Sequence, residues 1–307
     1  MENKVKLIKL YETHYSKIKD GSILTPAGEV YKYGSLYSYK TALNHLQGFR
    51  DIDLSKLDDK YIQDFTAYLV KKPLLKNTIG GILKCLFAVL NYHKRLLKNN
   101  LKYSQPKELP TIVVLSEAEI TKMLALKLTG IVELVRDVFV LQANIGVRYS
   151  DLKRICEDGA NQYLKEYCSR EIISIRTQKS GKEISIPIRK QARRILNKYD
   201  YKKIQIPCNQ SVNKYIKIIA KEAGIDNKIV LTRTRSGKLY DETKGKYQCI
   251  TSHTARRSFA TNAILNNVST ESIMLVTGHS TISAFRRYVG VTNIQNAIKL
   301  FSHPFFK

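Results

Sequence analysis

The sequence is poor in acidic residues. Its 307 residues contain 26 Asp and Glu against 52 Lys and Arg, which gives a formal net charge of +26 and a pI near 9.8. Residues 1–110 carry 19 basic and 10 acidic side chains, and residues 111–307 carry 33 and 16, so the excess is spread along the chain. Such an imbalance repels itself, and its most common use is contact with a polyanion. One alternative is that the charge serves general solubility. Membrane-surface binding is another, but no basic amphipathic segment of the kind that it requires stands out.

Paired cysteines are also missing. The five cysteines are scattered and form no CxxC pair: Cys85, Cys156, Cys168, Cys208 and Cys249. This pattern argues against a disulfide framework or a zinc site, and it indicates a reducing compartment. The first residues are too charged for a signal peptide, and no uncharged apolar run approaches the ~18 residues of a membrane span. We therefore expect a cytoplasmic protein that makes no membrane contact.

Two motifs of cofactor-dependent enzymes are absent as well. The sequence contains no GxxxxGK[ST] phosphate loop and no obvious carboxylate cluster of the kind that two-metal nucleases use. We expect neither a nucleotide nor a metal cofactor.

What the sequence does contain is helical periodicity. Apolar residues recur at helical spacing in four segments of residues 1–100, one over about 5–19 and others that begin near Ser35, near Tyr61 and at Asn77, a plausible N-cap. The segment LKYSQPKELPTI holds two prolines and separates this bundle from a new helix start, where Ser116 and Glu119 form a capping box.

The predicted domains follow these boundaries. We expect a helical domain over 1–105, a linker over 106–112 and a second domain over 113–307. The second domain contains a β-hairpin over 172–188, with a turn at KSGK. Further helices are predicted over 190–199, 211–223, 254–266, 269–277 and 281–288, and a polar loop over 232–248. The fold class is mainly α with a small β-sheet, an α+β arrangement.

The densest set of chemically active side chains lies near the C-terminus. His253 and Arg256 stand three apart, His279 follows a glycine, and Tyr288 comes nine residues later. Far upstream, the motif GVRYSDL puts Arg148 at the start of another predicted helix. The guanidinium group of arginine binds phosphate oxygens in a bidentate way, histidines donate hydrogen bonds to them, and a phenol can attack phosphorus. Taken alone, an arginine of this kind is more simply a solvated charge and a histidine a core residue, and Tyr288 is one of 19 tyrosines. Together they predict chemistry on a phosphodiester.

The order of these motifs resembles the tyrosine recombinase (phage integrase) family. GVRYSDL is followed by a hairpin that bears a lysine, then by HxxR, by GH and by the tyrosine. The helical bundle at 1–105 resembles the family's core-binding domain, and 113–307 its catalytic domain. The chain looks closest to integrases of mobile elements in Bacteroidetes-type genomes. The bundle begins almost at once, so we expect no separate arm-binding domain.

The resemblance implies a role for each motif residue. Arg148 and Arg256 would be the paired arginines that, together with His279, stabilise the charge that develops on the phosphate. Tyr288 would be the nucleophile, and His253 the candidate acceptor of its proton.

Three further residues extend this site. Lys179 stands eight residues before Pro187, as in the family's hairpin motif, and is the candidate acid for the departing 5′-oxygen. Asp151 replaces a common Glu and is expected to orient Arg148. Arg257 stands where many members have His, and it would either add a phosphate contact or face solvent.

The implied function is site-specific DNA recombination or integration through a 3′-phosphotyrosine, without ATP or metal. The implied partners are double-stranded DNA with a specific site, further copies of the chain (a tetramer on DNA) and accessory DNA-bending proteins. Two alternatives stay open, a type IB topoisomerase-like enzyme and a catalytically silent DNA-binding homologue. The target sequence stays open too, as does whether the C-terminal tail docks on a neighbouring protomer or on its own domain.

Overall fold

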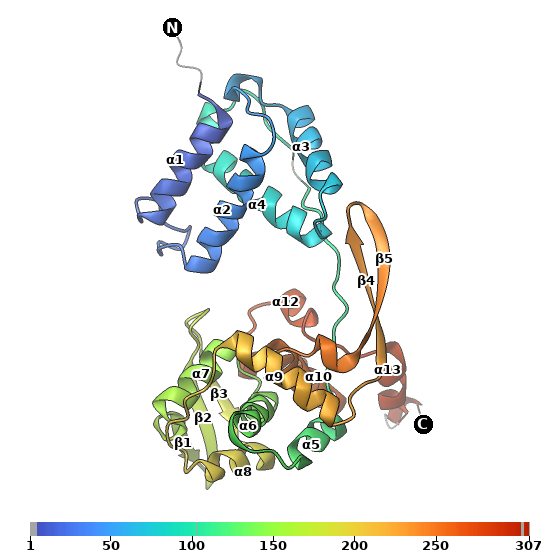
Figure 1. Ribbon diagram of the computed structural model, residues 1–307. Helices are drawn as coiled ribbons and strands as arrows, with labels where there is room; N and C mark the ends of the chain where they lie inside the picture. The colour runs from blue at the N-terminus through green and yellow to red at the C-terminus, as the bar shows by residue number, and fades with distance from the viewer. Residues whose placement is uncertain (1–4, 103, 302–303, 307) are drawn as a thin grey trace. The chain divides into compact units, whose positions relative to one another are not determined.

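The computed structural model describes residues 5–102, 104–301 and 304–306. The chain divides into two compact units (Figure 1). The first extends to Pro110 and includes Leu231–Glu242, and the second consists of Thr111–Val230 and the chain from Thr243 onward. Helices dominate both units, and the strands form small antiparallel sheets, which confirms the predicted fold class.

The described residues of the first unit contain four α-helices, as the spacing of apolar residues predicts: α1 (Leu7–Lys19), α2 (Tyr33–Gln47), α3 (Asp59–Lys71) and α4 (Lys76–Tyr92). Their apolar faces meet in one core that contains Tyr11, Leu46, Phe65 and Leu83. Asn77 is not the N-cap of α4, because the helix begins one residue earlier, after Leu75. Its side chain instead pairs with both backbone groups of Glu108, at 3.0 and 3.1 Å.

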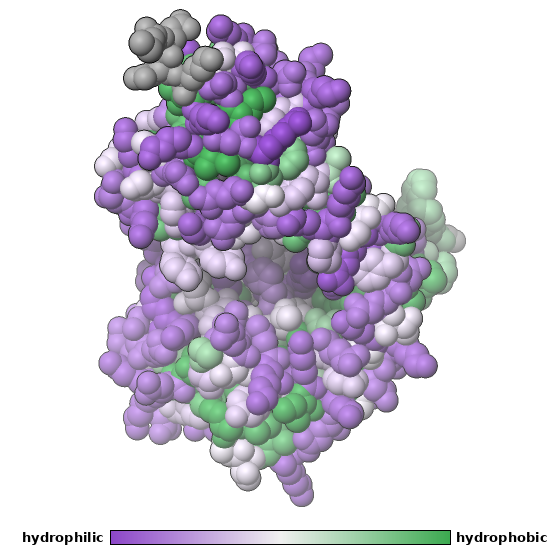
Figure 2. All heavy atoms as spheres, turned by 45° about the horizontal axis from the view of Figure 1, so that its top comes forward, coloured by the Kyte–Doolittle hydropathy of each residue, from purple (hydrophilic) through white to green (hydrophobic). Residues whose placement is uncertain are grey.

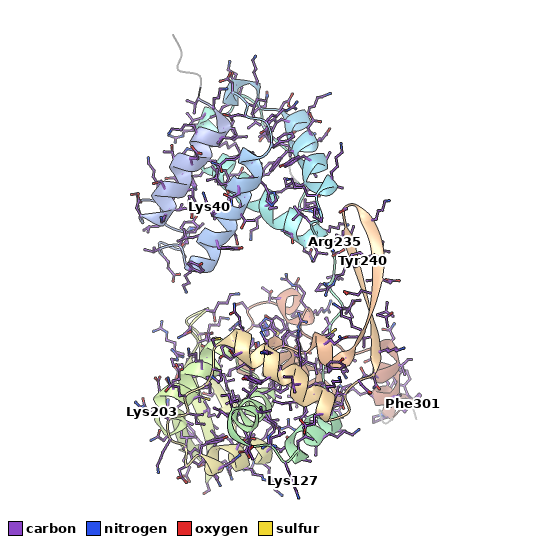
Figure 3. All side chains as sticks on the ribbon, in the orientation of Figure 1. Lys40, Lys127, Lys203, Arg235, Tyr240 and Phe301 are labelled. Carbon is purple, nitrogen blue, oxygen red and sulfur yellow. The ribbon has the colours of Figure 1, made fainter. Side chains whose placement is uncertain are left out.

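The predicted loop at 232–248 is wrong over most of its length. The chain forms a hairpin here from β4 (Lys228–Arg235) and β5 (Lys238–Gly245). Ser236 and Gly237, between the strands, both have positive φ, as the tightest hairpin turns require. The tip belongs to the first unit, where Arg235 bridges to Leu75 and the Ser236 N–H donates to the Leu74 carbonyl. Figure 3 labels Arg235 and Tyr240 on this hairpin.

The second unit holds the remaining elements. Its sheet has the order β1-β2-β3, all antiparallel, and contains the predicted hairpin as β2 and β3: β1 (Leu164–Tyr167), β2 (Arg170–Arg176) and β3 (Glu183–Pro187). Its helices are α5 (Glu117–Ala125), α6 (Gly130–Ile145), α7 (Tyr149–Asp158), α8 (Lys190–Lys198), α9 (Asn209–Glu222), α10 (Ser252–Leu265), α11 (Thr270–Thr277), α12 (Ile282–Arg286) and α13 (Asn293–Leu300).

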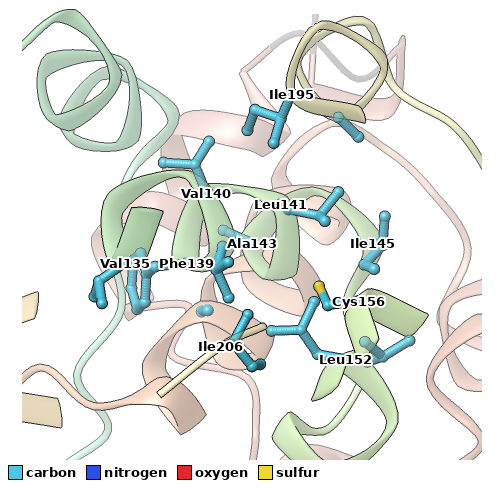
Figure 4. Packing of buried hydrophobic residues seen from close by; sticks show 14 of the residues in the cluster. Val135, Phe139, Val140, Leu141, Ala143, Ile145, Leu152, Cys156, Ile195 and Ile206 are labelled. Atoms are coloured by element: carbon cyan, nitrogen blue, oxygen red, sulfur yellow. The ribbon is translucent and has the colours of Figure 1, made fainter. Parts of the chain in front are cut away.

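Helix α6 runs through the core of the second unit. Every residue from Val135 to Ile145 is buried. Figure 4 shows its apolar side chains packed among Leu152 and Cys156 of α7, Ile195 of α8 and Ile206. Helices α8, α9 and α10 all pack on α6, so α6 helps to position α10, which carries part of the candidate site.

The outer surface is mainly polar. Hydrophilic residues cover most of each unit on the face that Figure 2 shows. Helix α13 is an exception, since Ile294 and Ile298 are exposed on it, as is Phe301 directly after it (Figure 3). Its Lys299 Nζ donates to the Ile264 carbonyl of α10 at 2.6 Å. Among the described residues, no helix combines the length and the apolar character needed to cross a membrane.

Candidate active site

Two arginines meet in the second unit although they are far apart in sequence. Arg148 is the N-cap of α7 and follows Gly146, the left-handed C-cap of α6, by two residues. Arg256, on α10, donates through Nη1 to the Gly146 carbonyl at 2.7 Å and through Nη2 to the Thr277 carbonyl at 2.5 Å. One guanidinium therefore links the C-terminal ends of α6 and α11.

Both arginines keep unused donors. Arg256 is only 1% exposed. The Nε atoms of Arg256 and Arg257 and the Nη1 atom of Arg148 are buried, without a hydrogen-bond partner in the described part of the chain. Burial, and then the positive charge of Arg148, lower the pKa of Arg256 to about 10. Unsatisfied buried donors and neighbouring like charges both cost free energy, and an anion would relieve both costs.

The tyrosine and the first histidine face each other. Tyr288 lies just after α12, and its Oη is 3.3 Å from the Nε2 atom of His253 on α10. The guanidinium carbons of Arg256 and Arg257 lie 5.4 and 5.9 Å from the centre of the Tyr288 ring. Burial, and then the charges of Arg257 and Arg256, lower the pKa of His253 below 6.5. This lowering favours the neutral form of His253, the form that accepts the phenol proton.

The second histidine completes the cluster. His279 follows Gly278, the left-handed C-cap of α11. Its Nε2 is 3.4 Å from Nη2 of Arg256, and its ring centre is 4.7 Å from that of Tyr288. Burial, and then the charges of Arg256 and Arg148, lower the pKa of His279 to about 4.

Lys179 lies in the turn between β2 and β3, and its side chain is exposed. Its charge also lowers the pKa of His253, although less than those of the arginines. The fully buried Asp151 of α7 accepts the backbone N–H of Gln178 at 2.8 Å, directly before the lysine. Its other oxygen, Oδ2, has no hydrogen-bond partner among the described residues. Asp151 therefore anchors the turn, whereas the sequence suggested only a role in orienting Arg148.

The fold thus brings together most of the side chains that the motifs single out. Polar contacts and ring contacts join Arg256, His253, His279 and Tyr288, and electrostatic interactions connect Arg148, Lys179 and Arg257 to them.

The motifs in the sequence do not single out Thr277, although it lies in the site. This fully buried residue contacts Arg256 through its carbonyl and His279 through its hydroxyl, at 2.7 Å. The only signal in the sequence is a polar residue at the end of a helical pattern, directly before the glycine and histidine. No group of three or more metal-ligating side chains occurs in the part of the chain that the structure describes.

Two family models match the chain. The phage integrase SAM-like domain matches residues 6–104, and the phage integrase family matches residues 141–293. The second match contains all of the clustered side chains. The chain therefore belongs to the phage integrase family, and it is a DNA-breaking and DNA-rejoining enzyme of the tyrosine recombinase class.

Solved structures share the fold over nearly the whole chain. A XerH recombinase bound to a palindromic difH substrate, in a post-cleavage complex, has a TM-score of 0.65 and 14% identity, covering 98% of each chain. A lambda integrase tetramer bound to a Holliday junction has a TM-score of 0.64 and 16% identity, covering 94% of this chain and 78% of that one. The Tn1549 transposon integrase bound to circular intermediate DNA has a TM-score of 0.62 and 14% identity, covering 96% and 99%. No curated protein sequence matches the chain.

Proposed function

We propose that the chain is a site-specific DNA recombinase in which Tyr288 attacks the scissile phosphorus. The observation that carries this proposal is the 3.3 Å contact between Tyr288 Oη and Nε2 of His253, beside two arginines with unused donors. A phenol with a pKa near ~10 attacks poorly at neutral pH unless a base takes its proton and the phosphate is polarised. The cluster contains His253 as the base, and Arg148 and Arg256 to polarise the phosphate.

The reaction then follows from the groups present. His253 accepts the proton as Tyr288 Oη bonds to phosphorus, while Arg148 and Arg256 stabilise the charge that develops on the non-bridging oxygens. Lys179 gives a proton to the departing 5′-oxygen. The products are a 3′-phosphotyrosine and a free 5′-hydroxyl. Since one phosphoester replaces another, a 5′-hydroxyl of a second strand reverses the step without ATP.

The substrate under this proposal is double-stranded DNA with a specific site. The net charge of +26 suits a polyanion, and the three solved structures described above are named as DNA complexes. Residues 1–105 would form the core-binding domain, 106–112 the linker and 113–307 the catalytic domain. A homotetramer on DNA, accessory DNA-bending proteins and a task in a mobile element are parts of the same proposal.

Covalent trapping tests the nucleophile. A nicked suicide substrate loses a short strand after cleavage, so the wild-type chain accumulates a covalent protein–DNA band. We expect Tyr288→Phe to give no band, because the attacking oxygen is gone. Tyr167→Phe is the matched control, since Tyr167 is 60% exposed on β1. A band that persists in Tyr288→Phe identifies a different nucleophile, and the absence of a band in the wild type favours a catalytically silent DNA-binding protein.

A further inference from the structure

Thr277 makes two hydrogen bonds through one hydroxyl group. It is the last residue of α11 and is fully buried. Its Oγ1 lies 2.6 Å from the carbonyl oxygen of Ile273, one turn earlier, and 2.7 Å from Nδ1 of His279. Its own carbonyl accepts from Nη2 of Arg256. The residue therefore touches both a catalytic arginine and a catalytic histidine.

The proton positions in this chain of contacts can be counted. A hydroxyl group carries a single proton, and a carbonyl oxygen carries none. The contact between Thr277 Oγ1 and the Ile273 carbonyl is a hydrogen bond only if the hydroxyl proton lies on that line. Oγ1 then presents a lone pair to His279, so Nδ1 of His279 must supply the proton of the second contact.

The other ring nitrogen leads to the same conclusion. Nε2 of His279 faces Nη2 of Arg256 at 3.4 Å. A guanidinium only donates hydrogen bonds, so the nitrogen opposite it presents a lone pair. Both contacts select the neutral ring with its proton on Nδ1 and none on Nε2.

The groups around the ring keep it in this state. Arg256 faces it from α10 and Arg148 from the start of α7, and both positive charges act against protonation. The rings of Tyr288 and Phe285 pack on it at 4.7 and 5.5 Å, from the chain around the end of α12. Burial is the largest cause that lowers the pKa of His279 to about 4, and the two charges add to it, so the ring is neutral at pH 7.

A neutral ring of this kind has no proton to give to a phosphate oxygen through Nε2. We propose that Thr277 fixes His279 as the Nδ1–H tautomer, and that Nε2 becomes a donor only when the scissile phosphate arrives and one proton is taken up from solvent. The phosphate supplies the negative charge that the two arginines lack, so it favours the imidazolium. Thr277 then accepts from the charged ring and holds its plane. This inference rests on the proposed function, since it assigns the phosphate to the same cluster.

Substitution at Thr277 tests the role of the hydroxyl group. Thr277→Val keeps the branched shape and the carbonyl that Arg256 uses, but it removes the acceptor of the Nδ1 proton. A hydrogen bond to a charged group is worth enough that we expect covalent complex formation to slow about 10- to 100-fold. Thr277→Ser keeps the acceptor, and we expect it to stay within about 3-fold of wild type.

The pH profile separates this role from general damage to the fold. The reactive complex needs a protonated His279, so the rate falls as pH rises through the DNA-bound pKa of that ring. Without its acceptor the imidazolium is harder to form, and in Thr277→Val the fall occurs at lower pH. A loss of rate that is equal at every pH contradicts the proposal, as does a Thr277→Ser variant as slow as Thr277→Val.

Two measurements address the proton directly. Nitrogen-15 NMR of the free wild-type chain, which has six histidines, assigns the tautomer of the signal that His279→Gln removes. We expect Nδ1–H, and an Nε2–H ring overturns the proposal. Calorimetric titration with a cognate duplex in two buffers of different ionisation enthalpy counts protons, with Tyr288→Phe as the parent to prevent cleavage. The parent should take up about one proton per protomer more than the same protein with His279→Gln, and equal uptake overturns the proposal.

The proposed function and the proposed tautomer of His279 can be disproved separately. If the wild-type chain forms no covalent complex with nicked DNA, the proposed function fails. The NMR measurement on the free chain then still shows which ring nitrogen of His279 carries the proton, and an Nε2–H ring overturns the role assigned to Thr277.

Discussion

At the scale of single residues, Gly146 connects the two arginines of the candidate site. Its carbonyl accepts from Arg256, and Arg148 follows two positions later. Its φ is 70°, and a Cβ added here would lie 2.3 Å from the ring of Phe259 on α10. A side chain at this position must therefore move either the Phe259 ring or the segment that carries Arg148.

We expect Gly146→Ala to lose both stability and activity. The left-handed conformation costs roughly 1–2 kcal/mol for a residue with a Cβ, and the clash with the ring adds about 1–3 kcal/mol. Gly224→Ala is the matched control, because Gly224 has a φ of 71° and nothing within 4 Å of the added Cβ. Chemical denaturation should show the larger loss for Gly146→Ala, and only that variant should cleave nicked DNA more slowly. Equal effects of the two substitutions contradict the assigned contact.

The spacing of residues in the sequence predicted which side chains meet, but not how they share protons. Arg148, Arg256 and Tyr288 could be named because their order along the chain is distinctive. The tautomer of His279 depends on its distances to the Thr277 hydroxyl group and to Arg256 of α10, and no linear pattern contains those distances. Thr277 escaped notice for the same reason, since a threonine at a helix end is ordinary in sequence and acquires its role only from the neighbours that the fold provides.

At the scale of elements, α7 and the turn between β2 and β3 act together. Asp151 of α7 accepts the N–H of Gln178, and Arg154 of α7 donates to the Arg176 carbonyl at the end of β2. These contacts lie on either side of Thr177, whose carbonyl accepts the Gly181 N–H across the turn at 2.9 Å. The turn that carries Lys179 is thereby attached to the helix that Arg148 starts.

We expect Asp151→Ala to impair Lys179 more than the rest of the site, because the Gln178 N–H loses its acceptor. Cleavage of ordinary nicked DNA should slow about 10-fold or more, since a positioned general acid contributes roughly 10²–10⁴-fold. A 5′-bridging sulfur leaves as a thiolate and needs little help from an acid. Asp151→Ala and Lys179→Ala should therefore both recover on a substrate with sulfur at that position, as judged by the rate of covalent complex formation.

Asp151→Asn is the control for this experiment, because its side-chain carbonyl still accepts the Gln178 N–H while the charge is lost. It should cleave ordinary DNA faster than Asp151→Ala. Failure of the sulfur substrate to rescue Asp151→Ala while it rescues Lys179→Ala would show that Asp151 acts elsewhere, for example on the arginines.

The predicted elements differ from the unpredicted ones in which of their faces are exposed to solvent. Helices α1 to α4 each have one buried and one exposed face, and their apolar spacing reveals them. Helix α6 is buried on all sides from Val135 onward, so its polar side chains do not mark a face exposed to solvent, and the helix was not identified. The β4–β5 hairpin is a two-stranded ribbon whose residues are mostly polar, and such a ribbon resembles a loop in sequence.

At the scale of the whole molecule, the charge cannot be balanced internally. Even if each of the 26 acidic side chains paired with a different basic one, 26 of the 52 Lys and Arg would remain without a carboxylate. Some basic side chains already use two carboxylates, as Lys198 does when it contacts both Glu133 and Asp137. The surplus therefore persists in the folded chain and raises its free energy until an anionic partner neutralises it.

This surplus predicts a steep dependence of DNA binding on salt. Each Lys or Arg that neutralises a phosphate releases counterions, so the logarithm of the association constant should fall by about 0.9 per tenfold rise in salt for every phosphate contacted. Fluorescence anisotropy with the Tyr288→Phe variant measures binding without cleavage, between roughly 50 and 200 mM salt, where 6–10 phosphate contacts lower the affinity about 10³- to 10⁵-fold. A scrambled duplex of equal length should bind more weakly than the cognate site but also show a clear salt dependence, because the phosphates are present in both. If binding to the cognate site is nearly independent of salt, the basic side chains do not contact DNA and the surplus serves another purpose.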